Sequence, residues 1–177
     1  MKTKAFILIV VIAAVLAAAG WWFMRPKSPS GKASISHNGL EVSISYSRPY
    51  KKGRVIFGDA ASGALQPNGQ YWRLGANAAT EITFNKDVTF AGKPLKAGTY
   101  RIYAVPGQGN WEIILNSELG KSGSELPDKS KDVLSVEVPS TAGDTTVEQF
   151  TIEFRPGDPG IVMELNWDRT KVAVDIA

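Results

Sequence analysis

Hydrophobic and polar residues alternate along most of the chain after its first 32 residues. Segment 40–47, LEVSISYS, is the clearest case, because every second residue is apolar. A period of two is typical of a strand that buries one face. The Asn38-Gly39 dipeptide before this segment is a strong hairpin signal. We therefore expect 33–37 and 40–47 to pair as antiparallel strands.

Further short strands with turn residues between them follow to the end of the chain. We expect them at 80–84, 88–90, 99–105, 111–115, 133–138, 147–154, 161–167 and 170–176, the last two joined through Asp168-Arg169. Helix signals are weak, with a short helical turn at 59–65 and a long polar loop at 118–131. The pattern predicts an all-β fold, an antiparallel β-sandwich or jelly-roll-like domain of about ten strands.

An uncharged apolar run, 5–24, precedes the strands. As a helix it would be about 30 Å long, which is the hydrocarbon thickness of a bilayer. Two tryptophans near its end suit the membrane–water interface. One alternative is an uncleaved anchor and the other a signal peptide cut near 17–19. We expect the anchor, because the run continues past those small residues to spanning length.

The sequence therefore predicts three parts: a signal-anchor or signal peptide at 1–25, a linker at 26–32 and a β-sandwich domain at 33–177. A single N-terminal helix would hold the domain on the extracytoplasmic (periplasmic) side of the cell membrane. Secretion after signal cleavage is the alternative.

The distribution of charged residues along the chain indicates which kinds of partner to expect. The net charge is +3, but five of the 20 basic residues lie at or before Lys32, so from Ala33 onward 15 basic residues face 17 acidic ones. The positive excess flanks the apolar run and indicates membrane topology, so we expect no nucleic-acid partner.

Residues for metal and nucleophilic chemistry are scarce. The chain has no cysteine and one histidine, His37, beside the predicted turn. Sites with several Cys or His ligands are thereby excluded, and neither a P-loop nor a dinucleotide fingerprint occurs. We expect no metal and no cofactor. Carboxylates are scattered, although two could still meet in space as an acid–base pair.

Two polar clusters are the strongest candidates for a site. Four cations occur within the seven residues 48–54, and a second cluster follows at 72–77. Arginine forks suit carboxylate, phosphate or sulfate groups. The predicted ligand-binding residues are Arg48, Lys52, Arg54, Trp72, Arg73 and Asn77. Alternatively these cations hold loops, for example by pairing Arg73 with Asp168. Trp111 and Trp167 are expected in the core, although such rings also stack on sugars.

A set of motifs occurs in a fixed order: Ser-Arg-Pro at 47–49, Lys-Gly-Arg at 52–54, Trp-Arg-Leu-Gly-Ala-Asn at 72–77, Ala-Gly-Thr-Tyr at 97–100 and Trp-Asp at 167–168. With these motifs the region 33–177 resembles domain-of-unknown-function family 2911, which is found in exported bacterial proteins. Members often have an acidic residue after Gly-Ala-Asn, where this chain has Ala78. The resemblance implies no particular activity and supplies no catalytic residue.

The sequence favours a membrane-tethered cell-envelope β-sandwich that binds an anionic or sugar-like ligand. The alternative is an envelope hydrolase acting on sugars or related polymers. A deep pocket with two carboxylates near Arg48 and Arg73 would indicate the hydrolase. A basic or aromatic patch without an acid–base pair would indicate binding.

Overall fold

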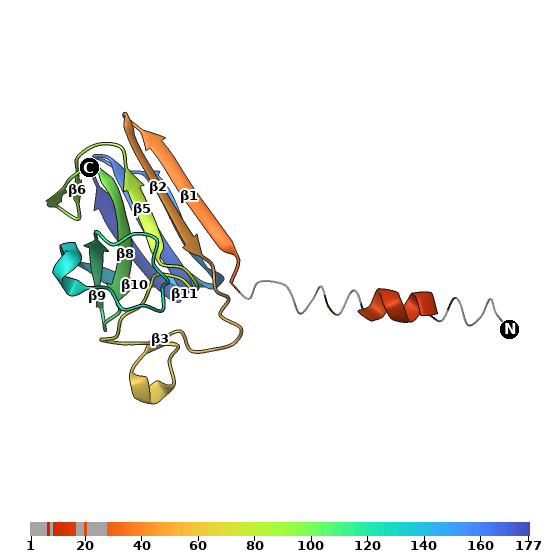
Figure 1. Cartoon of the computed structure of the whole chain (residues 1–177). Helices are drawn as coiled ribbons and strands as arrows, with labels where there is room; N and C mark the ends of the chain where they lie inside the picture. The colour runs from red at the N-terminus through yellow and green to blue at the C-terminus, as the bar shows by residue number, and fades with distance from the viewer. Residues whose placement is uncertain (1–6, 8, 17–19, 21–27) are drawn as a thin grey trace.

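The structure is a computed structural model that describes residues 7, 9–16, 20 and 28–177. Residues 9–16 are helical, and the chain from Ser30 onward is dominated by strands (Figure 1). Within the described part of the chain, no helix has both the length and the apolar character to cross a membrane. The predicted anchor at 1–25 lies largely outside the described residues and stays a prediction. The predicted linker is too long, since residues 30–32 belong to the first strand.

Nine of the strands form one sheet with the order β1-β2-β5-β8-β9-β10-β11-β6-β7, and every pairing in it is antiparallel. Two short strands, β3 and β4, pair in parallel. The elements are β1 (Ser30–His37), β2 (Leu40–Ser47), β3 (Phe57–Gly58), η1 (Ala60–Ser62), β4 (Gln66–Pro67), β5 (Thr80–Phe84), β6 (Val88–Phe90), β7 (Lys93–Leu95), β8 (Gly98–Val105), β9 (Asn110–Asn116), η2 (Lys129–Lys131), β10 (Asp132–Pro156) and β11 (Ile161–Ile176). The predicted antiparallel β fold, the hairpin at Asn38-Gly39 and the long loop after β9 are confirmed.

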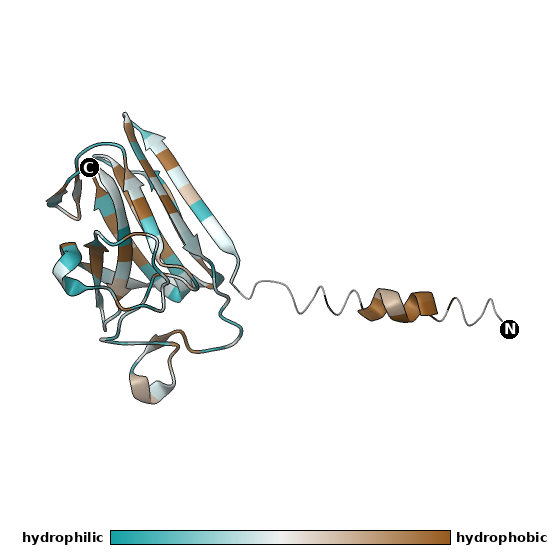
Figure 2. Cartoon of the chain, in the orientation of Figure 1, coloured by the Kyte–Doolittle hydropathy of each residue, from teal (hydrophilic) through white to brown (hydrophobic). Residues whose placement is uncertain are grey.

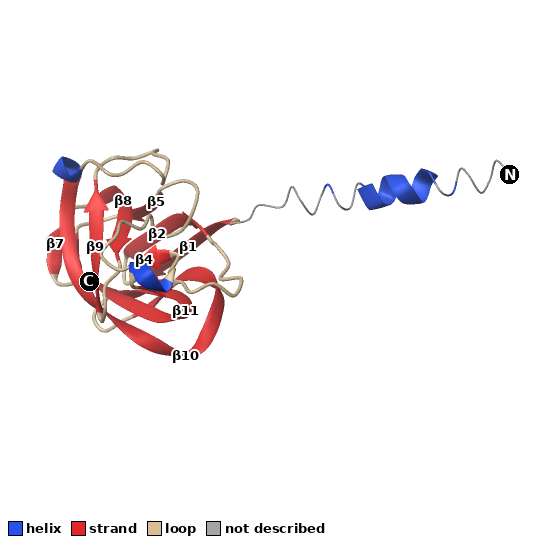
Figure 3. Cartoon of the chain, turned by 90° about the horizontal axis from the view of Figure 1, so that it is seen from below, coloured by secondary structure: helices blue, strands red, loops and turns tan. Residues whose placement is uncertain are grey.

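The sheet turns back on itself along β10, so the two halves of the sheet face each other. The first part of β10 pairs with β9 and the rest pairs with β11, and both strands curve strongly in Figure 3. Two of our expectations are wrong here, because 133–138 and 147–154 are one strand, as are 161–167 and 170–176. Register shifts near Val147 and the left-handed Asp168, with φ 54°, form bulges that bend the strands without ending them.

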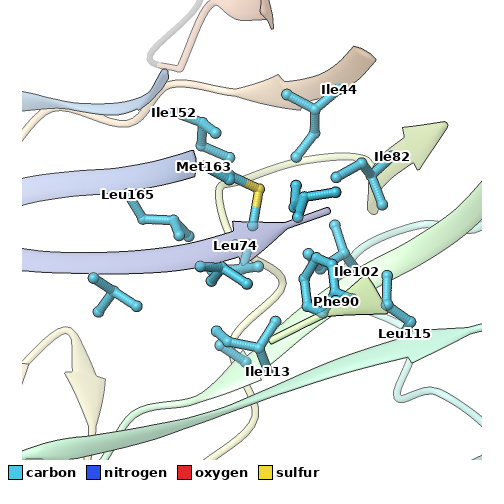
Figure 4. Packing of buried hydrophobic residues seen from close by; sticks show 14 of the residues in the cluster. Ile44, Leu74, Ile82, Phe90, Ile102, Ile113, Leu115, Ile152, Met163 and Leu165 are labelled. Carbon is cyan, nitrogen blue, oxygen red and sulfur yellow. The ribbon is translucent and has the colours of Figure 1, made fainter. Parts of the chain in front are cut away.

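The core lies between the two halves of the sheet. Apolar residues alternate with polar ones along the first strands (Figure 2), as a strand with one buried face requires. Ile44 and Ile82 of one half approach Met163 of the other (Figure 4). Each side chain of this size stabilises the fold by about 1.5–3 kcal/mol when it is fully buried.

An aromatic cluster closes the end of the core next to the loops that follow β2. It consists of Phe57, Trp72, Trp111, Phe150 and Trp167, with ring centroids 4.7–6.0 Å apart. The predicted core position of Trp111 and Trp167 is confirmed, since they are 3% and 1% exposed. This cluster forms a rigid base for the loops above it.

Part of the outer face of β8 and β9 is also buried, beside segment 117–131. Arg101 is 1% exposed, and its Nη2 donates to Tyr71 Oη at 2.7 Å and to the Glu125 carbonyl at 2.5 Å. Tyr103 Oη donates to Asp132 at 2.9 Å. Burial, and then this hydrogen bond, raise the pKa of Tyr103 well above its ordinary value of 10.0. The polar contacts fix segment 117–131 over the sheet.

Candidate ligand-binding pocket

A pocket of about 480 Å³ opens beside the aromatic cluster, where the chain enters the domain. Four stretches of chain and one residue of β11 form its walls. The lining residues are Ser28, Pro49, Tyr50, Lys52, Arg54, Leu65, Gln66, Arg73, Gly75, Ala76 and Trp167. In Figure 1 this is the end of the domain that carries β3.

The loop after β2 forms the first wall of the pocket. Its backbone is tied to β10 on both sides of Tyr50, because Phe150 N donates to Pro49 O at 2.9 Å and Lys51 N donates to Glu148 O at 2.7 Å. Beyond these bonds the chain turns sharply, with Lys52 at φ 49°. The turn leaves the side chains of Lys52 and Arg54 exposed at the pocket.

Segment 72–77 forms the facing wall of the pocket. Gly75 has φ 146°, and a Cβ there would lie 2.6 Å from the Ser47 carbonyl oxygen, so no other residue fits without moving the backbone. Trp72 Nε1 donates to the Gly75 carbonyl at 3.3 Å, and Thr80 Oγ1 donates to the Leu74 carbonyl at 2.8 Å. The core thus holds this wall in place.

Segment 117–131 supports Arg73 from behind. Gly123 N donates to Asn77 O at 2.9 Å, and a Cβ on Gly123 would lie 2.5 Å from Arg73 Cδ. Tyr71 Oη donates to the Gly123 carbonyl at 3.1 Å. The buried Arg101 network therefore reaches the stem of a pocket cation through Tyr71.

Strained backbone is concentrated around the pocket. Six described residues other than glycine have positive φ, and Lys52, Leu74, Asn77 and Asp168 all lie in or next to its walls. A left-handed conformation costs a leucine or lysine about 1–2 kcal/mol. Such outliers occur preferentially at ligand sites.

The three pocket cations have no acidic partner among residues 28–177. Lys52, Arg54 and Arg73 take part in none of the ion pairs found there. Arg54 donates to the backbone carbonyls of Tyr50 and Lys51, and Arg73 Nη1 donates weakly to the Asn77 carbonyl at 3.4 Å. The carboxylate of Glu148 accepts from the backbone N–H of Lys52 at 2.9 Å, but no carboxylate of residues 28–177 is within ion-pair distance of the three side-chain cations.

Asp168, the expected partner of Arg73, pairs with another cation. Lys51 Nζ lies 2.9 Å from Asp168 Oδ2 and also donates to the Arg54 carbonyl at 2.9 Å. The alternative prediction of an Arg73–Asp168 pair is therefore wrong. Lys51 is the cation that holds the loop, which leaves Arg73 available to the pocket.

Acid–base groups are absent from the described lining. No aspartate or glutamate is among the described residues that line the pocket, although Glu148 lies next to it and accepts from Lys52 N. His37 lies at the far end of β1 and contacts Asn38. Nowhere in the described part of the chain do three His, Cys, Asp or Glu side chains gather as a metal site would require.

The family model with the description "Protein of unknown function (DUF2911)" matches residues 28–176. This chain belongs to that family. The match begins at Ser28 and spans every described residue of the pocket. Searches of curated proteins and of solved structures found no match.

Among the six predicted site residues, three line the pocket of this DUF2911 domain and three lie elsewhere. Arg48 donates to the Phe150 carbonyl at 3.3 Å and to Thr151 Oγ1 at 2.9 Å, which turns it toward β10. Trp72 is 2% exposed in the aromatic cluster. Asn77 Nδ2 donates to the Ser28 carbonyl at 3.1 Å and fastens the start of the domain.

Other DUF2911 pocket residues were not singled out from the sequence. Tyr50, Leu65 and Gln66 give no local signal, because they reach the pocket only through the fold. Gly75-Ala76 and Trp167 belong to the motifs at 72–77 and 167–168. Trp167 was expected mainly in the core, with stacking on a ligand as the alternative. Trp167 serves both as core and as pocket floor.

Proposed function

We propose that this DUF2911 domain is a binding module for an anionic ligand, which occupies the pocket between segments 49–54 and 73–76. The supporting observation is that Lys52, Arg54 and Arg73 line one pocket without an ion pair or a lining carboxylate among the described residues. Cations gathered in this way repel one another, and a bound anion removes that repulsion.

An anionic ligand fits the pocket better than a neutral sugar. Sites for neutral sugars commonly add stacking on an exposed flat ring to the hydrogen bonds of the hydroxyl groups. The faces of Trp72 and Trp111 are packed against other aromatic rings in the core. Tyr50 remains as a half-buried ring in the wall, which suits the organic part of an anion.

The hydrolase alternative receives less support. Glycoside hydrolysis uses two carboxyl groups about 5–10 Å apart on either side of the bond that is cut. The described pocket lining contains neither of them. We therefore keep binding as the proposed activity.

We also propose that the domain is tethered to the envelope membrane through its N-terminal apolar run, on the extracytoplasmic side. The support is the length of the uncharged run and its closeness to the first strand, which begins at Ser30. Mass spectrometry of the native protein tests retention of the run. A mature N-terminus near Gly20 would indicate cleavage and secretion instead.

The binding proposal is tested by removing one pocket cation at a time. Arg73→Gln, Arg54→Gln and Lys52→Gln are compared with Lys86→Gln, whose exposed amine lies near Asn38 beside the β1–β2 turn. Thermal stabilisation of each protein by phosphate, sulfate and acidic oligosaccharides is measured at low and high salt. A charge-assisted contact is worth about 1.5–3 kcal/mol, so each pocket variant should bind about 10- to 100-fold more weakly.

The Lys86→Gln protein should bind as the parent does, and salt should weaken binding in both. If no anion stabilises the parent protein, or if Lys86→Gln loses as much affinity as Arg73→Gln, the pocket is not an anion site.

A further inference from the structure

Trp167 belongs to the core and to the pocket at once. Its ring stacks on Trp72 with centroids 5.8 Å apart and planes at 22°, and it meets Phe57 edge-on. The residue is 1% exposed, yet it borders the cationic pocket. One part of a buried ring therefore reaches the boundary between core and site.

The indole N–H of Trp167 has no acceptor among the described residues. The N–H of its stacked neighbour Trp72 has one, the Gly75 carbonyl. Buried tryptophan N–H groups normally find a partner, because an unpaired buried donor is costly. The neighbouring rings of Phe57, Trp72 and Phe150 offer no oxygen acceptor, and the pocket that Trp167 lines is a place where a ligand can supply one.

We propose that the Trp167 N–H donates a hydrogen bond to an oxygen of the ligand, and that the ligand is a phosphate ester of a small organic molecule. This inference rests on the proposed anion-binding function. The cations and the N–H are all donors, so the bound group must be an acceptor and anionic. A tetrahedral phosphate directs oxygens both toward rim cations and toward a donor on the floor, which a planar carboxylate does less well.

The size and walls of the pocket fit the organic part of such an ester. Its volume of about 480 Å³ exceeds what a phosphate group fills, and Pro49, Leu65 and Ala76 supply apolar wall. The N–H is shielded from water, so a rim side chain must move when the ligand enters. Lys52 and Arg54 are exposed and have the freedom to do so.

Phosphate esters reach this pocket from two sources, soluble metabolites and phospholipid headgroups. Ser28 lines the pocket and follows the end of the apolar run, Met24, by four residues. Four residues span at most about 14 Å, so an embedded run would hold the pocket within reach of the headgroups. The chemistry at the pocket is the same for both sources.

The test observes the indole N–H directly by NMR of the ¹⁵N-labelled full chain in a neutral detergent. Glycerol phosphate is titrated in, with inorganic phosphate and glycerol as comparisons. The Trp167 indole signal should shift downfield and saturate with glycerol phosphate, while that of Trp111, which lies outside the pocket lining, stays in place. The two signals are assigned through Trp167→Phe and Trp111→Phe, or by sequential assignment where a variant does not fold.

Trp167→Phe keeps an aromatic ring and removes the N–H, so it should lower affinity for glycerol phosphate about 10-fold. A Trp167 signal that stays still while Arg73→Gln weakens binding would overturn the inference and leave the anion site intact. If no phosphate probe binds, both this inference and the proposed anion-binding function are overturned.

The same signal in nanodiscs identifies the source of the phosphate. A shift in phosphatidylglycerol discs that is missing in phosphatidylcholine discs, with no probe added, supports the inference with an anionic lipid headgroup as ligand. A shift that occurs only with glycerol phosphate supports it with a soluble ester. A shift in both kinds of disc without the probe also supports the inference, because phosphatidylcholine carries a phosphodiester too. A signal that stays in place in both kinds of disc and with glycerol phosphate would contradict phosphate recognition in the pocket.

Discussion

Neighbouring cations of the loop after β2 have different tasks. Lys51 is about 20% exposed at its side chain and bonds to Asp168, whereas Lys52, next along the chain, is exposed at the pocket. The left-handed backbone at Lys52 sends the two side chains in different directions. One cation therefore shapes the loop, and the other is available to a ligand.

Removing Lys51 should cost stability, and removing Arg73 should cost little. Lys51→Ala leaves the partly buried Asp168 without its partner, so we expect a loss of about 1–2 kcal/mol, between the values for exposed and buried pairs. Arg73→Ala breaks no ion pair seen in residues 28–177 and should cost under about 0.5 kcal/mol. Urea unfolding measures both, and a larger loss in Arg73→Ala would contradict the assignment.

At the scale of elements, the local sequence pattern predicted where strands lie, but it did not predict which neighbouring segments form one continuous strand. The residue types of β2, β5 and β6 were enough to predict these strands, because apolar and polar residues alternate along each one and turn residues flank it. The continuity of β10 and β11 could not be predicted. The Asp168-Arg169 pair makes a turn or a bulge depending on the strand opposite, and here Val147 lies opposite Asp168.

The candidate site shows the same limit. Cation density in the sequence led to Lys52, Arg54 and Arg73, which line the pocket together. Arg48 belongs to the same run but is drawn away by the Phe150 carbonyl and by Thr151, more than 100 residues later. The second role of Trp167 likewise depends on β11 being placed beside the loops. Contacts so distant in sequence leave no local pattern.

The pairing of β10 with β11 contains a titratable cluster with a predictable pH response. Glu164, 13% exposed at its side chain, lies 2.6 Å from Arg155 Nε and 2.8 Å from Lys171 Nζ. Burial raises the pKa of this carboxyl, but the hydrogen bonds and charges of Lys171 and Arg155 bring it below its ordinary value of 4.5. A lowered pKa means stabilisation above pH 4.5 that is lost as the pH falls through the folded-state pKa.

Glu164→Gln should therefore be less stable than the parent by about 1 kcal/mol at pH 7. The difference should shrink as the pH falls below about 4.5, where the parent also becomes protonated. Unfolding free energies from urea titrations between pH 3 and pH 7 measure this. Glu137→Gln, an exposed carboxyl outside the ion pairs seen in the described residues, is the matched control. If the difference in unfolding free energy between Glu164→Gln and the parent stayed constant from pH 3 to pH 7, the ion pairs of Glu164 would not be its cause.

At the scale of the molecule, the β domain carries its own core and begins earlier than predicted. All the described strands lie at or after Ser30, and Pro29 O accepts from Arg48 N at 2.8 Å. Asn77 fastens the Ser28 carbonyl in addition. A cut at Ala33, the predicted start, would remove three residues of β1 and one residue of the pocket.

A chain of residues 28–177 should fold alone, giving a β-type circular dichroism spectrum and one cooperative urea transition. A chain of residues 33–177 should keep the spectrum but lose stability, because it lacks the hydrogen bonds of Ser28 and Pro29. A helix-dominated spectrum from 28–177 would contradict the fold. Equal midpoints for the two chains would show that the extra residues are unimportant.

The position of β11 between β10 and β6 sets an order of events during synthesis. The β6–β7 hairpin joins the sheet through β11 alone among the described pairings, although it emerges from the ribosome some 70 residues earlier. Until Ile161–Ile176 has been made, the hairpin has no strand to pair with in the sheet and the pocket lacks Trp167. Closure over such sequence distances is slow. Under the proposed function, a nascent or prematurely terminated chain that lacks Trp167 would therefore be unable to hold the ligand.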